Sequence, residues 1–377
     1  MINSQRMSQR FKELCEIDSV SRNERNVALE IEKILISMGA KISYDRAGEQ
    51  LGGNCSNMVA RFKGTVDAPP LFLCAHMDTV EPGKGIKVKF QDGEFQSEGP
   101  TILGADDKSA IAIILELMDI ILEKKIDYPP LEIIFTVCEE IGLLGAKHFD
   151  YSLIKSKFGY VLDSTDTQGI VTKAPAAVKI IARIYGKSAH AGAEPEKGTN
   201  AILMAASAIS KIQPGRLDSE TTCNIGIIKG GIATNIVPDF VEIHGEARSH
   251  NMEKLKDVIK NMTNAFYDTI KEFKTDEFEP RVEVIVEDDF PATHIPEDHQ
   301  VIQLAKKAAK NLNITMINKT IGGGADANIF FGKDIMGGVI GTGMTDVHTV
   351  NESIHIRDME NCVLLLIEIL KLQAAEK

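Results

Sequence analysis

Short apolar runs alternate with longer segments of helical periodicity through the first 174 residues. Apolar side chains at helical spacing predict one helix over residues 5–39, with Gly39 as its stop. A second, strongly apolar helix is expected at 107–123. Because strand and helix alternate, we expect a parallel sheet covered by helices. The strands are expected at 56–62, 70–76, 131–138 and 159–163.

The pattern changes after residue 174 to strand, helix, two strands, helix and strand. This β-α-β-β-α-β order is that of the split ferredoxin-like unit. The elements are expected at 177–185, 198–212, 221–229, 240–248, 251–273 and 281–287. The first pattern then resumes, with helices expected at 298–312 and 357–374 and a strand at 336–341. The expected fold class is therefore α/β, with a discontinuous domain (1–174 and 290–377) holding a mixed, mostly parallel sheet, and an inserted ferredoxin-like α+β domain (175–289).

Composition narrows the class of protein. A chain of 377 residues, 44% hydrophobic and 25% charged, is typical of a soluble protein of two domains. The net charge of −12 argues against nucleic-acid and anionic-membrane partners, which need a basic surface. We expect a cytoplasmic protein for three reasons. The six cysteines include no C-x-x-C pair, the N-terminus is polar, and no apolar segment is long enough to span a membrane.

Histidine and carboxylate side chains follow the predicted strands and open the buried helix. His76 ends one strand, and Asp78 faces the same side of the chain, where it could accept the second imidazole N–H. Taken alone, a histidine in this pattern is more often a capped core histidine than a metal ligand. Asp106 and Asp107 open helix 107–123, where a helix cap is the alternative explanation.

Three further segments carry the same residue types. Glu139 and Glu140 end an apolar strand, where paired carboxylates are costly unless they are paired or bind metal. Asp163 ends another strand, and His348 lies late in the chain. A solvated turn is the alternative for the paired glutamates, and a turn residue is the more common explanation of Asp163 when it is taken alone. Together, however, the segments predict a co-catalytic metal site, because imidazole and carboxylate ligate zinc and two metals can clamp a hydrolysed bond.

The inserted domain offers candidates for binding substrate. His190 stands between small residues, and Asn235 and Arg248 lie at strand ends. A loop histidine, a hairpin turn and a solvated arginine are the respective alternatives. Gly323, in a run of glycines, is a further substrate-binding candidate. The remaining histidines, His148, His244, His250, His294, His299 and His355, are expected at the surface or in structural roles.

These motifs resemble the di-zinc aminoacylase and carboxypeptidase superfamily, most closely its peptidase T-like enzymes. The resemblance covers essentially the whole chain. It implies that Asp106 bridges two metals, with His76 and Asp163 completing one and Glu140 and His348 the other. Its specific motifs are L-C-A-His76-M-Asp78-T-V, I-L-G-A-Asp106-Asp107-K-S-A, Glu139-Glu140-I-G, G-A-K-H-F-D (145–150) and G-K-S-A-His190-A-G.

The resemblance also implies the remaining roles. Glu139 would be the general base that deprotonates a water bridging the metals, and Asp78 the orienting acid. His190 would reach into the site of a partner subunit and polarise the scissile carbonyl, which implies a homodimer. Asn235 and Arg248 would contact the substrate carboxylate and the oxyanion. The family commonly holds the bond that matches 106–107 in cis.

The predicted function is metal-dependent hydrolysis of amide bonds in short peptides, as an aminotripeptidase or dipeptidase. Two divalent ions are expected, with zinc first and manganese or cobalt as alternatives. The segment T-G-M-T-D-V-His348 is more like carboxypeptidase and deacylase relatives, so a carboxypeptidase or N-acyl-amino-acid deacylase is the alternative. A non-catalytic metal-binding or scaffold protein is the alternative of another class.

Overall fold

The computed structural model describes residues 2–376, so the end residues Met1 and Lys377 of the predicted discontinuous domain lie outside the described residues. The chain divides into two compact units. The second unit comprises Ala174–Ala292 and Ile321–Gly324, and the rest of the described chain forms the first. No helix among residues 2–376 is both long enough and apolar enough to cross a bilayer.

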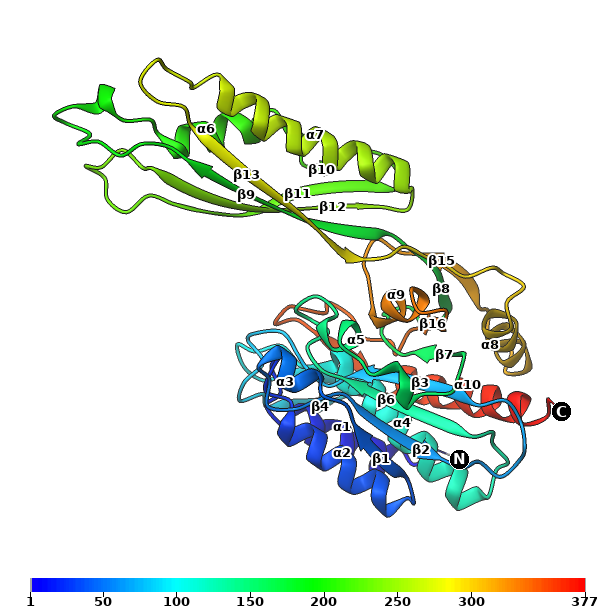
Figure 1. Ribbon diagram of the computed structural model, residues 1–377. Coiled ribbons are helices and arrows are strands. Elements are labelled where there is room, and N and C mark those ends of the chain that lie inside the picture. Colours follow the sequence, from blue (N-terminus) through cyan, green and yellow to red (C-terminus); the bar gives the residue numbers. More distant parts are fainter. Residues whose placement is uncertain (1, 377) are drawn as a thin grey trace. The chain divides into compact units, whose positions relative to one another are not determined.

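A mixed sheet forms the centre of the first unit (Figure 1). Its strand order is β1-β2-β6-β3-β7-β16-β8-β14, and β15 pairs with β8. The central strands β6, β3, β7 and β16 run parallel, whereas β1, β2 and the β16–β8 pair are antiparallel, which confirms the mostly parallel sheet. The strands are β1 (Lys41–Tyr44), β2 (Met58–Phe62), β3 (Leu71–His76), β6 (Leu131–Thr136), β7 (Phe158–Val161), β8 (Gly169–Ala174), β14 (Thr293–His294), β15 (Ile317–Thr320) and β16 (Met336–Ile340).

Helices pack around this sheet. The predicted apolar helix is α4 (Ala105–Lys124), which is buried around nearly its whole circumference between β3, α1 and α10. The other helices are α1 (Ser4–Cys15), α2 (Arg25–Ser37), α3 (Ala47–Leu51), α5 (Leu144–Lys147), α8 (Gln300–Asn311), α9 (Asp326–Phe331) and α10 (Ile356–Ala374). A small antiparallel sheet of order β17-β5-β4 joins β4 (Val88–Gln91), β5 (Glu94–Ser97) and β17 (Ser353–His355).

The prediction of a single helix over 5–39 is wrong, because α1 ends at Cys15 and α2 begins at Arg25. Tertiary hydrogen bonds hold the chain between them out of helical conformation. The Ser19 hydroxyl donates to the Met77 carbonyl at 2.9 Å, and the Ser21 hydroxyl donates to Asp78 at 2.6 Å. The connection therefore packs along the end of β3 instead of continuing the helix.

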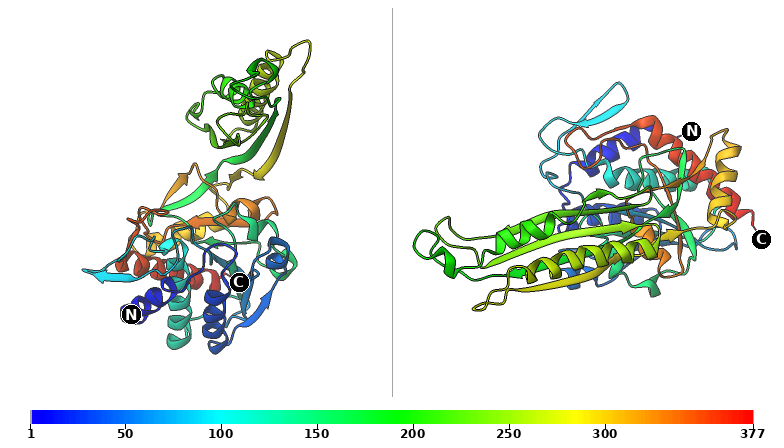
Figure 2. Two further views of the ribbon diagram at one scale, coloured as in Figure 1. Left: turned by 90° about the vertical axis from the view of Figure 1, so that its left-hand side faces the viewer. Right: turned by 90° about the horizontal axis from the view of Figure 1, so that it is seen from above.

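The second unit has the predicted ferredoxin-like order. Its antiparallel sheet is ordered β10-β11-β12-β9-β13, and α6 and α7 cover one face of it (Figures 1 and 2). Val241 and Ile243 of the sheet share a buried core with Phe266 of α7. The elements are β9 (Ala176–Tyr185), α6 (Ala201–Ile209), β10 (Gly215–Arg216), β11 (Thr221–Gly230), β12 (Phe240–Ser249), α7 (Met252–Lys271) and β13 (Arg281–Phe290).

Candidate metal centre

Three parallel strands carry the candidate ligands to one edge of the sheet. His76 is the last residue of β3 and pairs with Thr136, the last residue of β6. Glu139 and Glu140 follow β6, and Asp163 follows β7, the other neighbour of β3. Because parallel strands end at the same edge, side chains from distant segments meet there, as is usual for ligand sites in α/β sheets.

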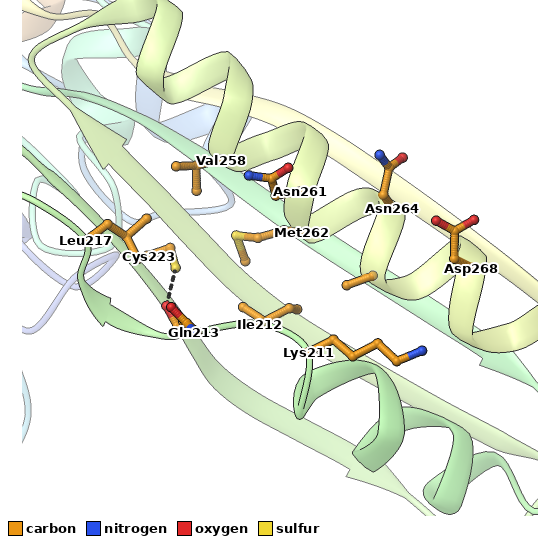
Figure 3. A pocket seen from close by; sticks show the side chains of 11 residues that line it. Lys211, Ile212, Gln213, Leu217, Cys223, Val258, Asn261, Met262, Asn264 and Asp268 are labelled. Carbon is orange, nitrogen blue, oxygen red and sulfur yellow. Dashed lines mark hydrogen bonds between the residues drawn. The ribbon is translucent and has the colours of Figure 1, made fainter.

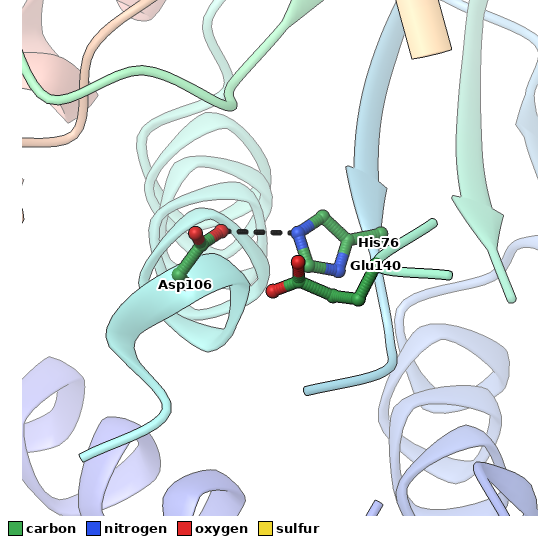
Figure 4. A group of neighbouring side chains, drawn as sticks. All are labelled: His76, Asp106 and Glu140. Atoms are coloured by element: carbon green, nitrogen blue, oxygen red, sulfur yellow. Dashed lines mark hydrogen bonds and ion pairs between the residues drawn. The ribbon is translucent and has the colours of Figure 1, made fainter. Parts of the chain in front are cut away.

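Asp106 lies between two imidazoles. Its Oδ1 is 3.0 Å from His76 Nε2, and its Oδ2 is 3.1 Å from His348 Nε2. Glu140 Oε2 is also 3.0 Å from His348 Nε2. Figure 4 shows Asp106 facing His76 with Glu140 beside them. Each oxygen of Asp106 thus faces a different histidine, as a carboxylate shared by two metals would. The Asp106–Asp107 peptide bond is cis, as the resemblance implied.

Among residues 2–376, two groups of side chains have ligand atoms that lie within 4.8 Å of one another. One group is His76, Asp106 and Glu140; the other is His76, Glu139 and Asp163. Glu139, predicted as the general base, therefore lies where it could also ligate a metal. The two groups hold the predicted base and four of the five predicted ligands, and His348 adjoins them through Asp106 and Glu140.

The charge of the cluster suits cations. Burial, and then the Asp163 carboxylate, raise the pKa of Glu139 well above its usual range. Desolvation also raises the pKa of Asp163 to about 8. The Asp106 and Glu140 carboxylates raise the pKa of His348 to about 10. Glu140 Oε1 is buried without a hydrogen-bond partner among the described residues. Divalent cations would compensate the crowded carboxylates and occupy such orphaned oxygens.

Asp78 holds the backbone beside the site rather than only the His76 ring. Its carboxylate accepts the amide N–H of Glu139 at 2.9 Å and that of Glu140 at 3.2 Å. His76 Nδ1 lies 2.9 Å from the Asp78 carbonyl and 3.5 Å from its carboxylate. The carbonyl is therefore the nearer partner that orients the imidazole, where we had expected the carboxylate.

Two acidic residues beside the cluster were given no role from the sequence. Glu352 accepts the amide N–H groups of Leu103, Gly104 and Asp106 at 2.8, 2.7 and 2.9 Å, so it fixes the approach to α4. Burial raises the pKa of Glu352 to about 7. Asp326 is buried at the start of α9 and accepts the Thr136 hydroxyl at 2.6 Å. The acid two residues after the three glycines was the one sequence signal available for Asp326.

The predicted substrate residues lie in the second unit. His190 is exposed, and its Nδ1 accepts the amide N–H groups of Gly192 at 3.2 Å and Ala193 at 3.1 Å. The neutral ring must then carry its proton on Nε2. The Ala191 amide donates to the Asn235 carbonyl at 2.9 Å, so His190 and Asn235 lie on adjacent loops.

Arg248 lies near the carboxyl end of β12. Its guanidinium donates to Glu246 at 2.9 Å and lies 5.7 Å from the centre of the Phe290 ring. A longer bond of 3.4 Å reaches the Gly322 carbonyl, next to the exposed Gly323. The structure thus brings Arg248 and the glycine turn together, and places His190 with Asn235 elsewhere in the unit.

The second unit also contains a cavity of about 440 Å³, shown in Figure 3. Apolar side chains such as Val258 and Met262 line it, with Lys211, Asn261 and Asp268 among its polar residues. None of the predicted ligands or substrate residues lines this cavity, so it is separate from the candidate site.

The chain is similar to known proteins over most or all of its length. The model of peptidase family M20/M25/M40 matches residues 72–372. The uncharacterized protein YqjE of Bacillus subtilis (strain 168) is 38% identical over 372 residues, which are 98% of this chain and 99% of that protein. A tripeptidase from Staphylococcus aureus subsp. aureus Mu50 aligns with a TM-score of 0.92 at 37% identity, over 100% of both chains.

The aminopeptidase PepT from Bacillus cereus ATCC 10987 aligns with a TM-score of 0.87 at 38% identity, again over 100% of both chains. The resemblance to peptidase T-like enzymes is thereby confirmed, and with it the α/β fold class and the assignment as a peptidase. The chain belongs to peptidase family M20/M25/M40.

Proposed function

We propose that this peptidase removes the N-terminal residue from short peptides, tripeptides or dipeptides. The observation that carries the proposal is the Asp106 carboxylate held between His76 and His348, one histidine to each oxygen. It is supported by the structural similarity to a tripeptidase and an aminopeptidase along the entire chain.

The donor set fits two divalent cations, and zinc is our first choice, with manganese or cobalt as alternatives. His76, Asp106 and Asp163 would hold one, and Asp106, Glu140 and His348 the other. Such ions, when bound, act as Lewis acids and make water a nucleophile at neutral pH.

Glu139 would accept a proton from the attacking water and return it to the leaving amine. Burial raises its pKa well above the usual range, which suits a group that must both take up and release a proton. Asp78, by accepting the amide N–H groups of Glu139 and Glu140, fixes the backbone that carries both side chains. The His190 Nε2–H would donate to the scissile carbonyl.

We further propose a homodimer whose two sites are each completed in trans, with residues 175–289 as the lid and dimerisation domain. Asn235 precedes β12, and Arg248 lies near its far end. The strand from residue 240 to residue 248 spans about 27 Å at ~3.4 Å per residue. A short peptide cannot touch both side chains of one chain, so both substrate roles require two copies.

An exposed sheet edge supports this pairing. On the outer side of β11, the short strand β10 pairs only with Thr222 and Cys223. The rest of that side of β11 has no strand partner among the described residues. Ile227 and Ile228 on it are 48% and 52% exposed, and Leu203 of α6 is 55% exposed. An unpaired edge with apolar neighbours suits pairing with a second copy about a two-fold axis.

The six cysteines are free and not joined in pairs, which supports a reducing, cytoplasmic location. The function is tested with a library of di- and tripeptides, C-terminally blocked peptides and acyl-amino acids, assayed with zinc, manganese and cobalt. Release of the N-terminal residue from short peptides is expected. Release of the C-terminal residue or of an acyl group would favour the alternative carboxypeptidase or deacylase, and metal-replete protein that cleaves nothing would favour a non-catalytic role.

A further inference from the structure

The turn after β6 is held by carboxylates on three successive backbone amides. Asp78 accepts the N–H groups of Glu139 and Glu140, and Glu24 accepts that of Cys138 at 3.1 Å. Cys138 has a φ of 54°, in the left-handed region that side chains other than glycine rarely adopt. The backbone that presents Glu139 and Glu140 is therefore fixed from outside the turn.

The Glu24 carboxylate does not cap the helix that it precedes. It precedes α2 at the N-cap position, yet its side chain makes no capping bond to that helix. Its Oε1 instead accepts the amide N–H of Arg22 at 2.8 Å and of Cys138 at 3.1 Å, with Cys138 Sγ at 3.4 Å. Glu24 is fully buried, and its Oε2 has no hydrogen-bond partner among the described residues. A buried carboxylate that caps no helix needs another reason to be there, because burying it is costly.

We propose that Glu24 is a positioning residue for the peptidase reaction: its bond to the Cys138 amide sets the conformation of the turn that aims Glu139 and Glu140. The inference rests on the proposed function, in which Glu139 is the base and Glu140 a ligand. It explains why residues 16–24 leave the helical path, since a continuous helix would not bring Glu24 to the end of β6. Replacing a residue that positions metal ligands through a hydrogen bond typically lowers metal affinity or activity by roughly 10–100-fold.

The chain provides a matched control at the other end of the same strand. Glu132, near the start of β6, is also buried and also accepts backbone amides, those of Lys155 at 2.9 Å and Ser156 at 2.9 Å. Glu132→Ala and Glu24→Ala each remove a buried carboxylate that binds two amides. Both should lower the melting temperature, but only Glu24→Ala should affect the site.

The experiment measures zinc affinity and kcat at saturating zinc for wild type, Glu24→Ala, Glu24→Gln and Glu132→Ala. We expect zinc affinity, kcat or both to fall about 10–100-fold in Glu24→Ala. Glu24→Gln should stay within about threefold of wild type, because its amide oxygen can still accept both N–H groups. Glu24→Asp keeps the charge and withdraws the acceptor by one methylene, so it provides the same comparison if the alanine variant does not fold.

The inference is overturned if the Glu24 variants match Glu132→Ala in both zinc affinity and kcat. It is also overturned if Glu24→Gln is as impaired as Glu24→Ala, since the charge and not the hydrogen bond would then matter. Wild-type protein that binds zinc but cleaves no peptide would refute the proposed function instead, and the zinc affinities would still decide the role of Glu24.

Discussion

Replacing Glu139 and Glu140 separately tests which of the two neighbours is the base. Glu139→Ala leaves His76, Asp106 and Asp163, which are the assigned ligands of one metal, and His76 and Asp106 remain 3.0 Å apart. Metal content should therefore stay near wild type. Positioned general bases typically contribute 10²–10⁴-fold, so kcat should fall by about that factor, or about 2.7–5.4 kcal/mol in the activation barrier.

Glu140→Ala should behave differently. It leaves only Asp106 and His348 as ligands on that side, so one metal should be lost together with the activity. The assay determines bound metal by elemental analysis after gel filtration, and kcat with a tripeptide under saturating metal. Glu139→Gln controls for the change in side-chain volume.

The reasoning would be refuted if Glu139→Ala loses a metal, because the group formed by His76, Glu139 and Asp163 would then be a true ligand set. Substantial remaining activity in Glu139→Ala with both metals bound would refute the base assignment as well. Unfolding is not expected to confuse the result, since removing a buried carboxylate whose pKa is raised relieves unfavourable desolvation.

Three further predictions concern stability and assembly. Without metal, Asp163 and Glu352 keep their protons in the folded chain after the unfolded chain has lost them, because their pKa values are raised from 3.8 to about 8 and from 4.5 to about 7. The contribution of these two groups to stability, measured in denaturant with a chelator, should thus be complete below about pH 4. It should fall as pH rises toward about 8, by up to ~1.4 kcal/mol per pH unit for each extra proton, whereas stability with metal should rise with pH over this range; a flat profile between about pH 4 and 8 without metal would contradict this. Mixing His190→Ala with Glu139→Ala protein should restore about a quarter of wild-type activity, because half of freely exchanging dimers are mixed and each holds one intact site; no gain despite demonstrated exchange would refute the trans assignment. Ile228→Lys should place a charge on the exposed edge of β11 and yield monomers in sedimentation experiments with an unchanged far-UV spectrum, and dimers of unchanged affinity would show that this edge is not the interface.

The sequence predicted those elements whose apolar pattern reflects their own burial. The strands β3 and β6 are buried along their whole length and α4 along most of its length, and the ligands at the strand ends follow from strand direction. The small sheet of β4, β5 and β17 was missed because β4 is mostly exposed and carries no such pattern. The burial of a single helix or strand can thus be predicted from its own apolar pattern, whereas the pairing of exposed strands cannot.

The residues around the site were harder to predict for a different reason. Glu24 and Cys138 are 114 positions apart, and nothing near either residue signals the other. Ser21 and Glu24 fell inside the single helix expected over residues 5–39, whereas they lie between α1 and α2. Buried polar partners are chosen by tertiary geometry, so a carboxylate in a polar stretch gives no sequence signal of its burial.

The position of β16 in the sheet has a consequence for how the chain folds. β16 lies between β7 and β8, which are nearly adjacent in sequence but precede it by more than 160 residues. While the chain is being synthesised, the edges of β7 and β8 that pair with β16 stay unpaired until residues 336–340 have been made. The strands and helices of the second unit are nearly contiguous and can assemble during that interval. The nascent first unit is therefore the part most exposed to aggregation, and a chaperone that shields sheet edges would act on it rather than on the inserted unit.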